Sequence, residues 1–309
     1  MRALVTGGAG FIGSHIAERL VRTGHAVRVL DDLSAGKRAN LAAVAGDVEL
    51  VVADVRDAAR VDELARDCDV IFHEAAIVSV PYSVEHPIQT NGVNVIGTLN
   101  VLEAARKQGV RRVVFACSAA VYGEDPAQPK TESMLPSPVS PYGVEKLASE
   151  HYLAAWSRLF GLETVSLRYF NVFGPRQDPS SPYSGVISIF VSRFLAGQPV
   201  TIFGDGEQYR DFVYVDNVVD ANLAAATRDG ISGRAFNVGC GRRTTLNQLV
   251  AILGHITGRA VLPRHEAPRA GDIRESLADI SRARRELAYE PRIDVDEGLA
   301  RLVEDVRRG

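Results

Sequence analysis

Short runs of β-branched residues alternate with amphipathic segments through the first half of the chain, and this alternation constrains the fold more than any other feature. The apolar runs read RALVT, AVRVLD, VELVVAD, DVIFHEA and RRVVFACS, with helical patterns near 12–23, 57–67 and 87–108. Strands that alternate with helices form βαβ units, whose strands run parallel in one sheet. The sequence therefore predicts an α/β protein with a Rossmann-type, doubly wound parallel sheet.

The character of the chain changes after Asn171. A helical pattern near 141–160 and the run ETVSLRYF still continue the alternation, but GPRQDPSSPYSG then concentrates proline, serine and glycine into a loop. We expect a first domain over 1–170 and a smaller α/β region over 171–309, with strands near 211–238 rejoining the first domain. The later elements are expected as helices near 186–196, 216–227, 245–257, 279–288 and 296–307, and as strands near 200–203, 211–215 and 234–238.

The composition is that of a globular protein with room for an interior site. Of 309 residues, 46% are hydrophobic and 24% are charged, and the net charge is −3. A net charge of this sign and size does not indicate nucleic-acid binding, and no apolar run approaches the ~18 residues of a membrane span. Three scattered cysteines without CxxC spacing and dispersed histidines favour neither disulfides nor a metal site. We expect a cytoplasmic protein without nucleic-acid, membrane or metal binding.

A glycine-rich turn follows the first predicted strand and opens the first helix. LVTGGAGFIGSH places Gly7, Gly8, Gly10 and Gly13 where glycine permits a tight turn and close backbone approach. The N–H groups at the start of a helix attract a pyrophosphate. A glycine-rich turn without a ligand has the same pattern, but the flanking strand and helix favour a dinucleotide site.

Acidic residues follow the next two strands. Asp31 ends the second strand at the spacing of the ribose-binding acid of dinucleotide sites, and its charge repels a 2′-phosphate, so NAD is favoured over NADP. Asp32 is either a second ribose contact or a turn residue. Asp54, after the third strand, either faces the adenine or caps the following helix.

Tyr142 and Lys146 are four residues apart in a predicted helix and therefore project from one face. An ammonium beside a phenol favours the phenolate, so we expect the pKa of Tyr142 to fall and the residue to act as a base. Lys146 is one of only four lysines among 35 basic residues, and arginine is not an equivalent substitute. Ser118 ends the fifth strand at the same sheet edge, where its hydroxyl either reaches a substrate oxygen or satisfies local backbone.

Several motifs in collinear order carry a family resemblance over nearly the whole chain. They read TGGAGFIGSH, FHEAA, CSAAVYGE, SPYGVEK, RYFNVFGPRQDP, GDGEQYRDFVYVDN, FNVGCG and PRAGDIRESLADIS. Together they resemble the extended short-chain dehydrogenase/reductases, specifically the UDP-hexose 4-epimerases. The resemblance implies that NAD stays bound while Tyr142 takes the proton from the sugar O4, hydride leaves C4, and the 4-keto sugar then receives hydride on its other face.

The resemblance also implies roles for individual residues. Ser118, Tyr142 and Lys146 are implied as catalytic, with Lys146 also binding the nicotinamide ribose. The implied cofactor-binding residues are Gly7, Gly10, Phe11, Ile12, Asp31, Asp32, Asp54, Val55, Ala75, Ala76, Asn94, Tyr142, Lys146 and Phe170. The implied UDP-sugar ligands are Ser79, Ser118, Tyr142, Asn171, Arg210, Arg269, Asp272 and Ser276. Arginines outside this set, such as Arg282, Arg284 and Arg285, are expected to be surface charges.

Ala119 and Ala120 separate this chain from related sugar-nucleotide dehydratases, which resemble it but carry an acid after the serine or threonine. A methyl group transfers no proton, so elimination of water is not expected. The alternatives left open are a net-redox or another epimerising sugar-nucleotide enzyme of the family, and a catalytically inactive NAD-sensing regulator.

Ser276 takes the place of a bulky tyrosine found in one bacterial type of the family, so the pocket is expected to admit N-acetylated as well as plain hexoses unless loop differences refill the space. Ser79 and Tyr82 are expected in a loop beside the sugar, where Tyr82 replaces a frequent arginine. The resemblance also implies a homodimer formed through helices near 87–108 and 141–160.

Overall fold

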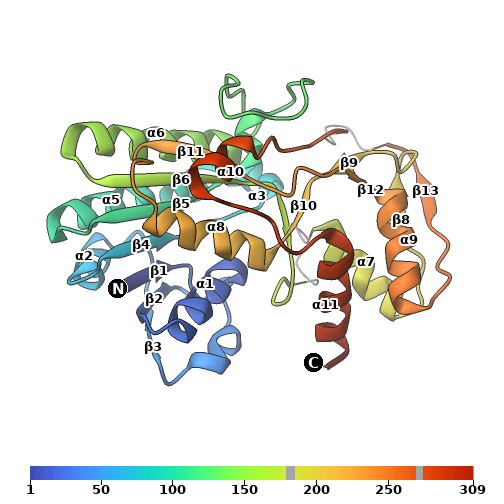
Figure 1. The fold of residues 1–309 in the computed structure, drawn as a ribbon, viewed down its shortest axis with the longest axis horizontal. Helices are drawn as coiled ribbons and strands as arrows, with labels where there is room; N and C mark the ends of the chain where they lie inside the picture. Colours follow the sequence, from blue (N-terminus) through green and yellow to red (C-terminus); the bar gives the residue numbers. More distant parts are fainter. Residues whose placement is uncertain (179–184, 269–273, 309) are drawn as a thin grey trace.

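A parallel sheet of seven strands forms the centre of the computed structural model, which describes residues 1–178, 185–268 and 274–308. The strand order is β11-β6-β5-β4-β1-β2-β3 (Figure 1). The strands are β1 (Arg2–Thr6), β2 (Ala26–Asp31), β3 (Val48–Val52), β4 (Val70–His73), β5 (Arg112–Ser118), β6 (Glu163–Tyr169) and β11 (Arg234–Val238). Every neighbouring pair is parallel, so the predicted fold class is confirmed.

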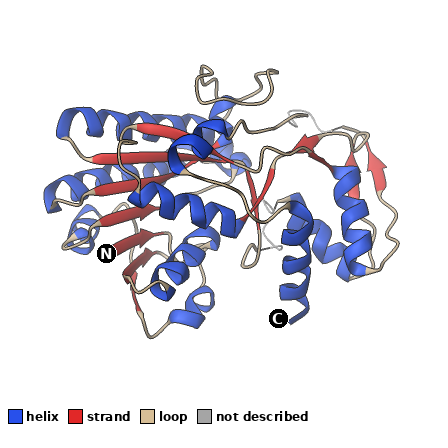
Figure 2. Ribbon diagram, in the orientation of Figure 1, coloured by secondary structure: helices blue, strands red, loops and turns tan. Residues whose placement is uncertain are grey.

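Helices cover both faces of the sheet, as Figure 2 shows. One layer contains α2 (Ala58–Ala65), α5 (Gly97–Gln108) and α6 (Pro141–Phe160), and the other contains α1 (Phe11–Arg22), α8 (Val215–Thr227) and α10 (Ser281–Leu287). The central strands are buried from both sides, which is why they read as continuous apolar runs. Val113, Val114 and Phe115 of β5 are at most 1% exposed.

The helix expected near 87–108 is built from three consecutive segments. α4 (Pro87–Asn91) leads into a π-helical turn (Gly92–Ile96), which continues as α5. Another helix, α3 (Val80–Glu85), precedes them where a loop was expected, and this expectation is wrong. Ser79 caps α3 by accepting a hydrogen bond from Tyr82 N over 3.0 Å, and proline stands in its first turn, a favourable N-terminal combination. Two 3₁₀ turns cover Arg38–Val44 and Ala119–Tyr122.

A second apolar core lies beside the carboxyl ends of the strands. α7 (Val186–Leu195), α9 (Leu246–Thr257) and α11 (Val295–Arg308) contribute to it. Short strands pair as β7 (Asn171–Phe173) with β10 (Phe212–Tyr214), β9 (Tyr209–Arg210) with β12 (Thr244–Thr245), and β8 (Thr201–Phe203) with β13 (Arg264–Glu266). Of the strands expected to rejoin the large sheet, β11 does and β10 does not. β10 pairs with β7 instead, because the apolar side chains of both strands pack into this second core.

Two arginines cap the C-terminus of α8: Arg111, just before β5, and Arg112, the first residue of β5. Arg112 is fully buried and donates to the carbonyl groups of Ala225 and Arg228 over 2.8 and 2.7 Å. Arg111 donates to Ala226 O over 2.8 Å. Because the last carbonyls of a helix lack partners and carry partial negative charge, guanidinium groups stabilise this end.

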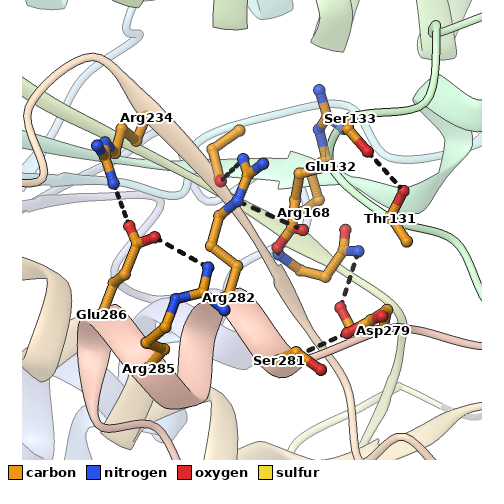
Figure 3. A network of polar contacts seen from close by, with 12 residues as sticks. Thr131, Glu132, Ser133, Arg168, Arg234, Asp279, Ser281, Arg282, Arg285 and Glu286 are labelled. Carbon is orange, nitrogen blue, oxygen red and sulfur yellow. Dashed lines mark hydrogen bonds and ion pairs between the residues drawn. The ribbon is translucent and has the colours of Figure 1, made fainter.

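A polar network joins the segment after β5 to β11 and α10 (Figure 3). The buried Glu132 side chain accepts a hydrogen bond from Asn237 N over 2.9 Å and pairs with Arg282 at 3.7 Å. Arg282 was expected to be a surface charge, and its side chain is 31% exposed but pairs with a carboxylate that is only 4% exposed. Arg284 and Arg285 are 51% and 67% exposed, as expected for surface charges.

Among the residues that the structure describes, none of the helices combines the length and apolarity that spanning a bilayer requires.

Candidate active site

The glycine turn lies against the segment that follows β4. Gly7 has φ +67°, and a Cβ atom there would come within 2.7 Å of Ala75 N. A Cβ at Gly13 would come within 2.3 Å of the carbonyl oxygen of Gly7. Glycine is therefore required at both positions, by the turn conformation and by the close approach of two backbones. Ala75 and the following Ala76 are thereby placed beside the turn.

The start of α1 and the end of β2 offer complementary groups to a dinucleotide. Gly10, the N-cap of α1, has no side chain to occupy the first N–H groups of the helix, which begins with Phe11 and Ile12. Asp31 is 6% exposed and accepts hydrogen bonds from Ala9 N and Leu33 N, both at 2.9 Å. Its oxygens retain further acceptor capacity for a ribose diol. Burial raises the pKa of Asp31. These donors and this acceptor fit NAD.

The two other acidic residues of the cofactor prediction have partners within the protein. Asp32 Oδ1 accepts hydrogen bonds from Ser34 N at 2.9 Å and Ser34 Oγ at 2.6 Å, as a turn residue does. Asp54 pairs with Arg56 at 2.6 Å, and these hydrogen bonds lower the pKa of Asp54. Asp57 is the residue that caps α2, so the alternative that Asp54 does so is wrong. Val55 is 4% exposed in the core.

Asn94, in the π-helical turn, holds the segment after β4 against α6. Its Oδ1 accepts from Ile77 N over 2.9 Å, while its Nδ2 donates to Ile77 O over 3.0 Å and to Glu145 Oε2 over 2.6 Å. Glu145 also accepts from Thr90 Oγ1 over 2.6 Å. Asn94 is 2% exposed and both N–H groups of its amide are committed to these bonds, so in this structure it positions the segment after β4.

Ser118, Tyr142 and Lys146 meet where β5 ends and α6 begins. Tyr142 is 8% and Lys146 2% exposed. Lys146 Nζ donates to Ala116 O over 2.7 Å and lies 5.9 Å from the centroid of the Tyr142 ring. Ser118 Oγ accepts from Ala120 N over 3.1 Å, so the hydroxyl also satisfies local backbone.

The pKa of Tyr142 departs from the expectation of a lowered value. Burial raises it, because a phenolate is costly away from water, and hydrogen bonding by the Ser118 side chain only partly offsets this rise. Burial likewise lowers the pKa of Lys146. The expectation treated the pair as solvated charges and neglected the desolvation of both groups.

On the substrate side, backbone bonds gather residues that are distant in sequence. Asn171 N donates to Asp211 O over 3.1 Å, and Ser276 N donates to Tyr209 O over 3.2 Å. Arg210, which follows Tyr209 in β9, has its Nη1 3.0 Å from Tyr209 O, so Arg210 and Ser276 lie near one another. Phe170 is 6% exposed, at the end of β6. Arg269 and Asp272 lie outside the described residues.

Sequence reasoning assigned no role to three polar residues around this site. Ser83 Oγ accepts from Tyr142 N over 3.1 Å, Glu145 holds Asn94, and Glu74 Oε1 accepts from Tyr169 OH over 2.9 Å. Glu74 stands within the motif FHEAA and Glu145 within SPYGVEK, so the motifs themselves were the available signal. Within the described ranges, no three His, Cys, Asp or Glu side chains gather as metal ligands would.

Comparison with known proteins identifies the family of this arrangement. The chain is 44% identical to the UDP-glucose 4-epimerase of Mycolicibacterium smegmatis, with 99% of each chain covered. It resembles the crystal structure of UDP-glucose 4-epimerase with UDP-glucose from Thermotoga maritima with a TM-score of 0.94 and 42% identity, over 100% of this chain and 99% of that one. It resembles the UDP-N-acetylglucosamine 4-epimerase of Methanobrevibacter ruminantium, in complex with UDP-N-acetylmuramic acid, with a TM-score of 0.95 and 39% identity, over 99% and 98% of the two chains. Residues 3–239 match the model of the NAD dependent epimerase/dehydratase family, so the predictions of family and cofactor are confirmed, and the chain belongs to that family.

Proposed function

We propose that this protein is a UDP-glucose 4-epimerase that interconverts UDP-glucose and UDP-galactose. The observation that carries the proposal is the meeting of Ser118, Tyr142 and Lys146 beside Ala119 and Ala120. The first three residues suit proton transfer at a sugar hydroxyl, and the two methyl groups provide no acid for expelling water.

Each residue has a distinct role in the proposed reaction. Bound NAD would supply the hydride acceptor for oxidation at C4 and the hydride donor for its reduction. Tyr142 takes the O4 proton as C4 is oxidised and gives it back when C4 is reduced. Ser118 hydrogen-bonds O4 and holds it near Tyr142. Lys146 supplies the positive charge that favours the phenolate and, by the same proposal, binds the nicotinamide ribose.

The remaining roles follow the chemistry of the two ligands. For the cofactor, the start of α1 binds the pyrophosphate and Asp31 binds the adenosine ribose. For the substrate, Arg210 and Arg269 clamp the UDP pyrophosphate, which suits guanidinium groups, and Asp272 binds the uridine ribose. Asn171 and Ser79 complete the UDP-sugar site. The other residues assigned by the family resemblance keep their proposed cofactor contacts.

Ser276 extends the proposal to N-acetylated sugars. Its backbone N–H bonds Tyr209 O, next to Arg210, and its side chain is small, so by this proposal it leaves space for a substituent on the sugar C2. The similarity to an enzyme named UDP-N-acetylglucosamine 4-epimerase supports this extension.

A product assay with four substrates tests the proposal. The purified protein is incubated separately with UDP-glucose, UDP-galactose, UDP-N-acetylglucosamine and UDP-N-acetylgalactosamine, and the products are separated. We expect each of the first two to yield the other without net NADH, and the N-acetylated pair to react as well. Failure to convert UDP-galactose with NAD bound would overturn the proposal, whereas stoichiometric NADH would indicate the net-redox alternative.

The proposal includes a cytoplasmic homodimer formed through the helical segments at 87–108, from α4 to α5, and at 141–160, α6. Apolar side chains on the outer face of α6 support it, since Val144 is 51%, Tyr152 39%, Leu159 71% and Phe160 49% exposed. Sedimentation of the intact protein should give a dimer, and Tyr152→Lys with Leu159→Lys should give monomers. Leu262→Lys, at another exposed leucine, is the matched control and should leave the dimer intact. A monomeric wild type would refute the dimer.

A further inference from the structure

Glu74 lies across the end of the strand that carries Ser118. It is the first residue after β4, and its Oε1 accepts a hydrogen bond from the hydroxyl of Tyr169, at the end of β6, over 2.9 Å. Strand β5 lies between β4 and β6 in the sheet, and Ser118 pairs in register with Tyr169. The bond from Tyr169 to Glu74 therefore passes beside the strand end where the candidate catalytic residues meet.

A buried donor from the opposite helix layer determines the direction of this bond. Asn222 of α8 is fully buried, and its Nδ2 donates to Tyr169 OH over 2.7 Å. Because the hydroxyl accepts from Asn222, its own proton is directed to Glu74. Among the described residues, Glu74 Oε2 makes no hydrogen bond, and Glu74 is half-buried, so this carboxyl has one protein donor and partial access to solvent.

The groups around Glu74 couple it to the candidate catalytic pair. Lys146 and Tyr142 interact with it electrostatically from α6, and Tyr169 from β6 donates the hydrogen bond. Cys117 of β5 faces the same region and is neutral, since burial raises the pKa of its thiol. The charge at Glu74 therefore acts on Lys146 and Tyr142, and also on Tyr169, whose pKa burial and Glu74 raise.

The titratable residues nearest to Glu74 do not neutralise a negative charge on its carboxylate. The ring of His73, which precedes Glu74, bonds Thr6 and Thr98, and burial lowers its pKa to about 3. Glu145 of α6 is committed to Asn94 and Thr90. Burial raises the pKa of Glu74 to about 7, against the lowering effects of Tyr169 and Lys146.

We propose that Glu74 is a positioning residue whose change of charge tunes the proton affinity of Tyr142 and Lys146 during epimerisation. The inference rests on the proposed function. Ionised Glu74 stabilises the Lys146 ammonium and opposes the Tyr142 phenolate, whereas protonated Glu74 relieves both effects. As the pH rises through neutrality, Tyr142 is deprotonated more readily. Glu74 ionises over the same range, and its negative charge opposes the phenolate, so it offsets part of this increase.

Two substitutions separate the charge of Glu74 from its hydrogen bond. Glu74→Gln removes the charge but keeps an oxygen that accepts from Tyr169. Tyr169→Phe keeps the carboxyl and removes its donor, so the pKa of Glu74 should rise. Infrared difference spectra recorded between about pH 5 and about pH 9 follow the carboxyl directly. The wild type should show a protonated-carboxyl component with a near-neutral midpoint that Glu74→Gln removes and that titrates at higher pH in Tyr169→Phe. The component of Asp211, whose pKa burial raises to about 6, should persist in both variants.

Kinetics then test the effect on the reaction. In the pH profile of kcat for UDP-galactose, the acidic limb of Glu74→Gln should move to lower pH by about one unit, the size expected for loss of a neighbouring like charge. NAD content and thermal unfolding should match the wild type. A superimposable profile with an active wild type overturns the inference alone, and so does a wild-type infrared spectrum lacking the band. A wild type without activity at any pH overturns the proposed function and, with it, this role.

Discussion

The side chain of Ser83 caps a helix to which it does not belong, because its Oγ accepts the backbone N–H of Tyr142, in the first turn of α6, over 3.1 Å. Ser83 is fully buried and its own hydroxyl donates to Val80 O over 2.7 Å. Within α6 the N-cap residue Ser140 accepts from Gly143 N instead. The backbone of the candidate base is therefore fixed from α3.

We expect Ser83→Ala to lower both stability and activity. The change leaves a buried N–H without an acceptor, which costs about 1–3 kcal/mol, and releases the start of α6 beside the reacting group. Urea unfolding and kcat for epimerisation measure the two effects. Asp294→Ala is the matched control, because it removes the side chain that accepts from Glu297 N over 2.9 Å at the start of α11, in another part of the fold. It should cost about 1 kcal/mol without changing kcat, and an unchanged kcat in Ser83→Ala would contradict the prediction.

We expect Lys146→Arg to abolish most activity despite keeping the charge. Nζ occupies a buried position 2.7 Å from Ala116 O and 4.8 Å from the centroid of the Phe115 ring, so a larger planar guanidinium would meet these neighbours at a different geometry. The expected loss in kcat is about 100-fold or more. Lys107→Arg, on the exposed last turn of α5, is the control and should behave as the wild type. Wild-type kcat in Lys146→Arg would show that a positive charge alone suffices.

Gly7→Ala should impair NAD binding. Its φ of +67° and the 2.7 Å approach of a Cβ to Ala75 N combine backbone strain with a backbone clash beside the proposed pyrophosphate position. Gly24→Ala has φ +81° but no atom within 4 Å of the added Cβ, so it carries strain without a clash. NAD released on denaturation of purified protein is the measurement. Equal NAD content in the two variants would argue against a cofactor position at Gly7.

Substitutions of Arg168 and Glu150 measure how much the loss of a buried ion pair lowers the free energy of unfolding. The pair is bidentate, at 2.9 and 2.6 Å, and both side chains are at most 10% exposed. Arg168→Met leaves a buried carboxylate without its cation, so a loss of about 3–5 kcal/mol in the free energy of unfolding is expected. The double variant with Glu150→Gln should recover part of it. Arg284→Met breaks an exposed pair and should cost less than about 1 kcal/mol in the same urea titration.

The parts predictable from the sequence were those with local physical causes. Burial of the strands on both faces makes continuous apolar runs, so their positions and the parallel sheet followed from the pattern. Gly7 and Gly13 were recognisable because close backbone contact requires glycine. The motifs were sufficient to identify the family, which the comparison of the chain with known proteins confirms.

Other features depend on contacts between distant segments, which a linear pattern does not contain. Nothing near Ser83 in sequence indicates that it bonds Tyr142, 59 residues away. The raised pKa of Tyr142 arises from burial by the assembled fold and not from its neighbour Lys146. β10 has the apolar composition of a sheet strand but pairs with β7, because the second core and not the local sequence selects its partner.

The capping of α8 by Arg111 and Arg112 also determines how much of the chain must be synthesised before it can fold stably. Two arginines synthesised early hold carbonyl groups of residues 225–228, and the neighbour of β6 in the sheet, β11, ends at Val238. Before residues 225–238 have emerged from the ribosome, the side chain of Arg112, which is buried in the folded protein, lacks its carbonyl acceptors. The edge of β6 that pairs with β11 is also exposed. A nascent chain ending near residue 170 should therefore depend on chaperones, and stable folding should begin only after about three quarters of the protein has emerged.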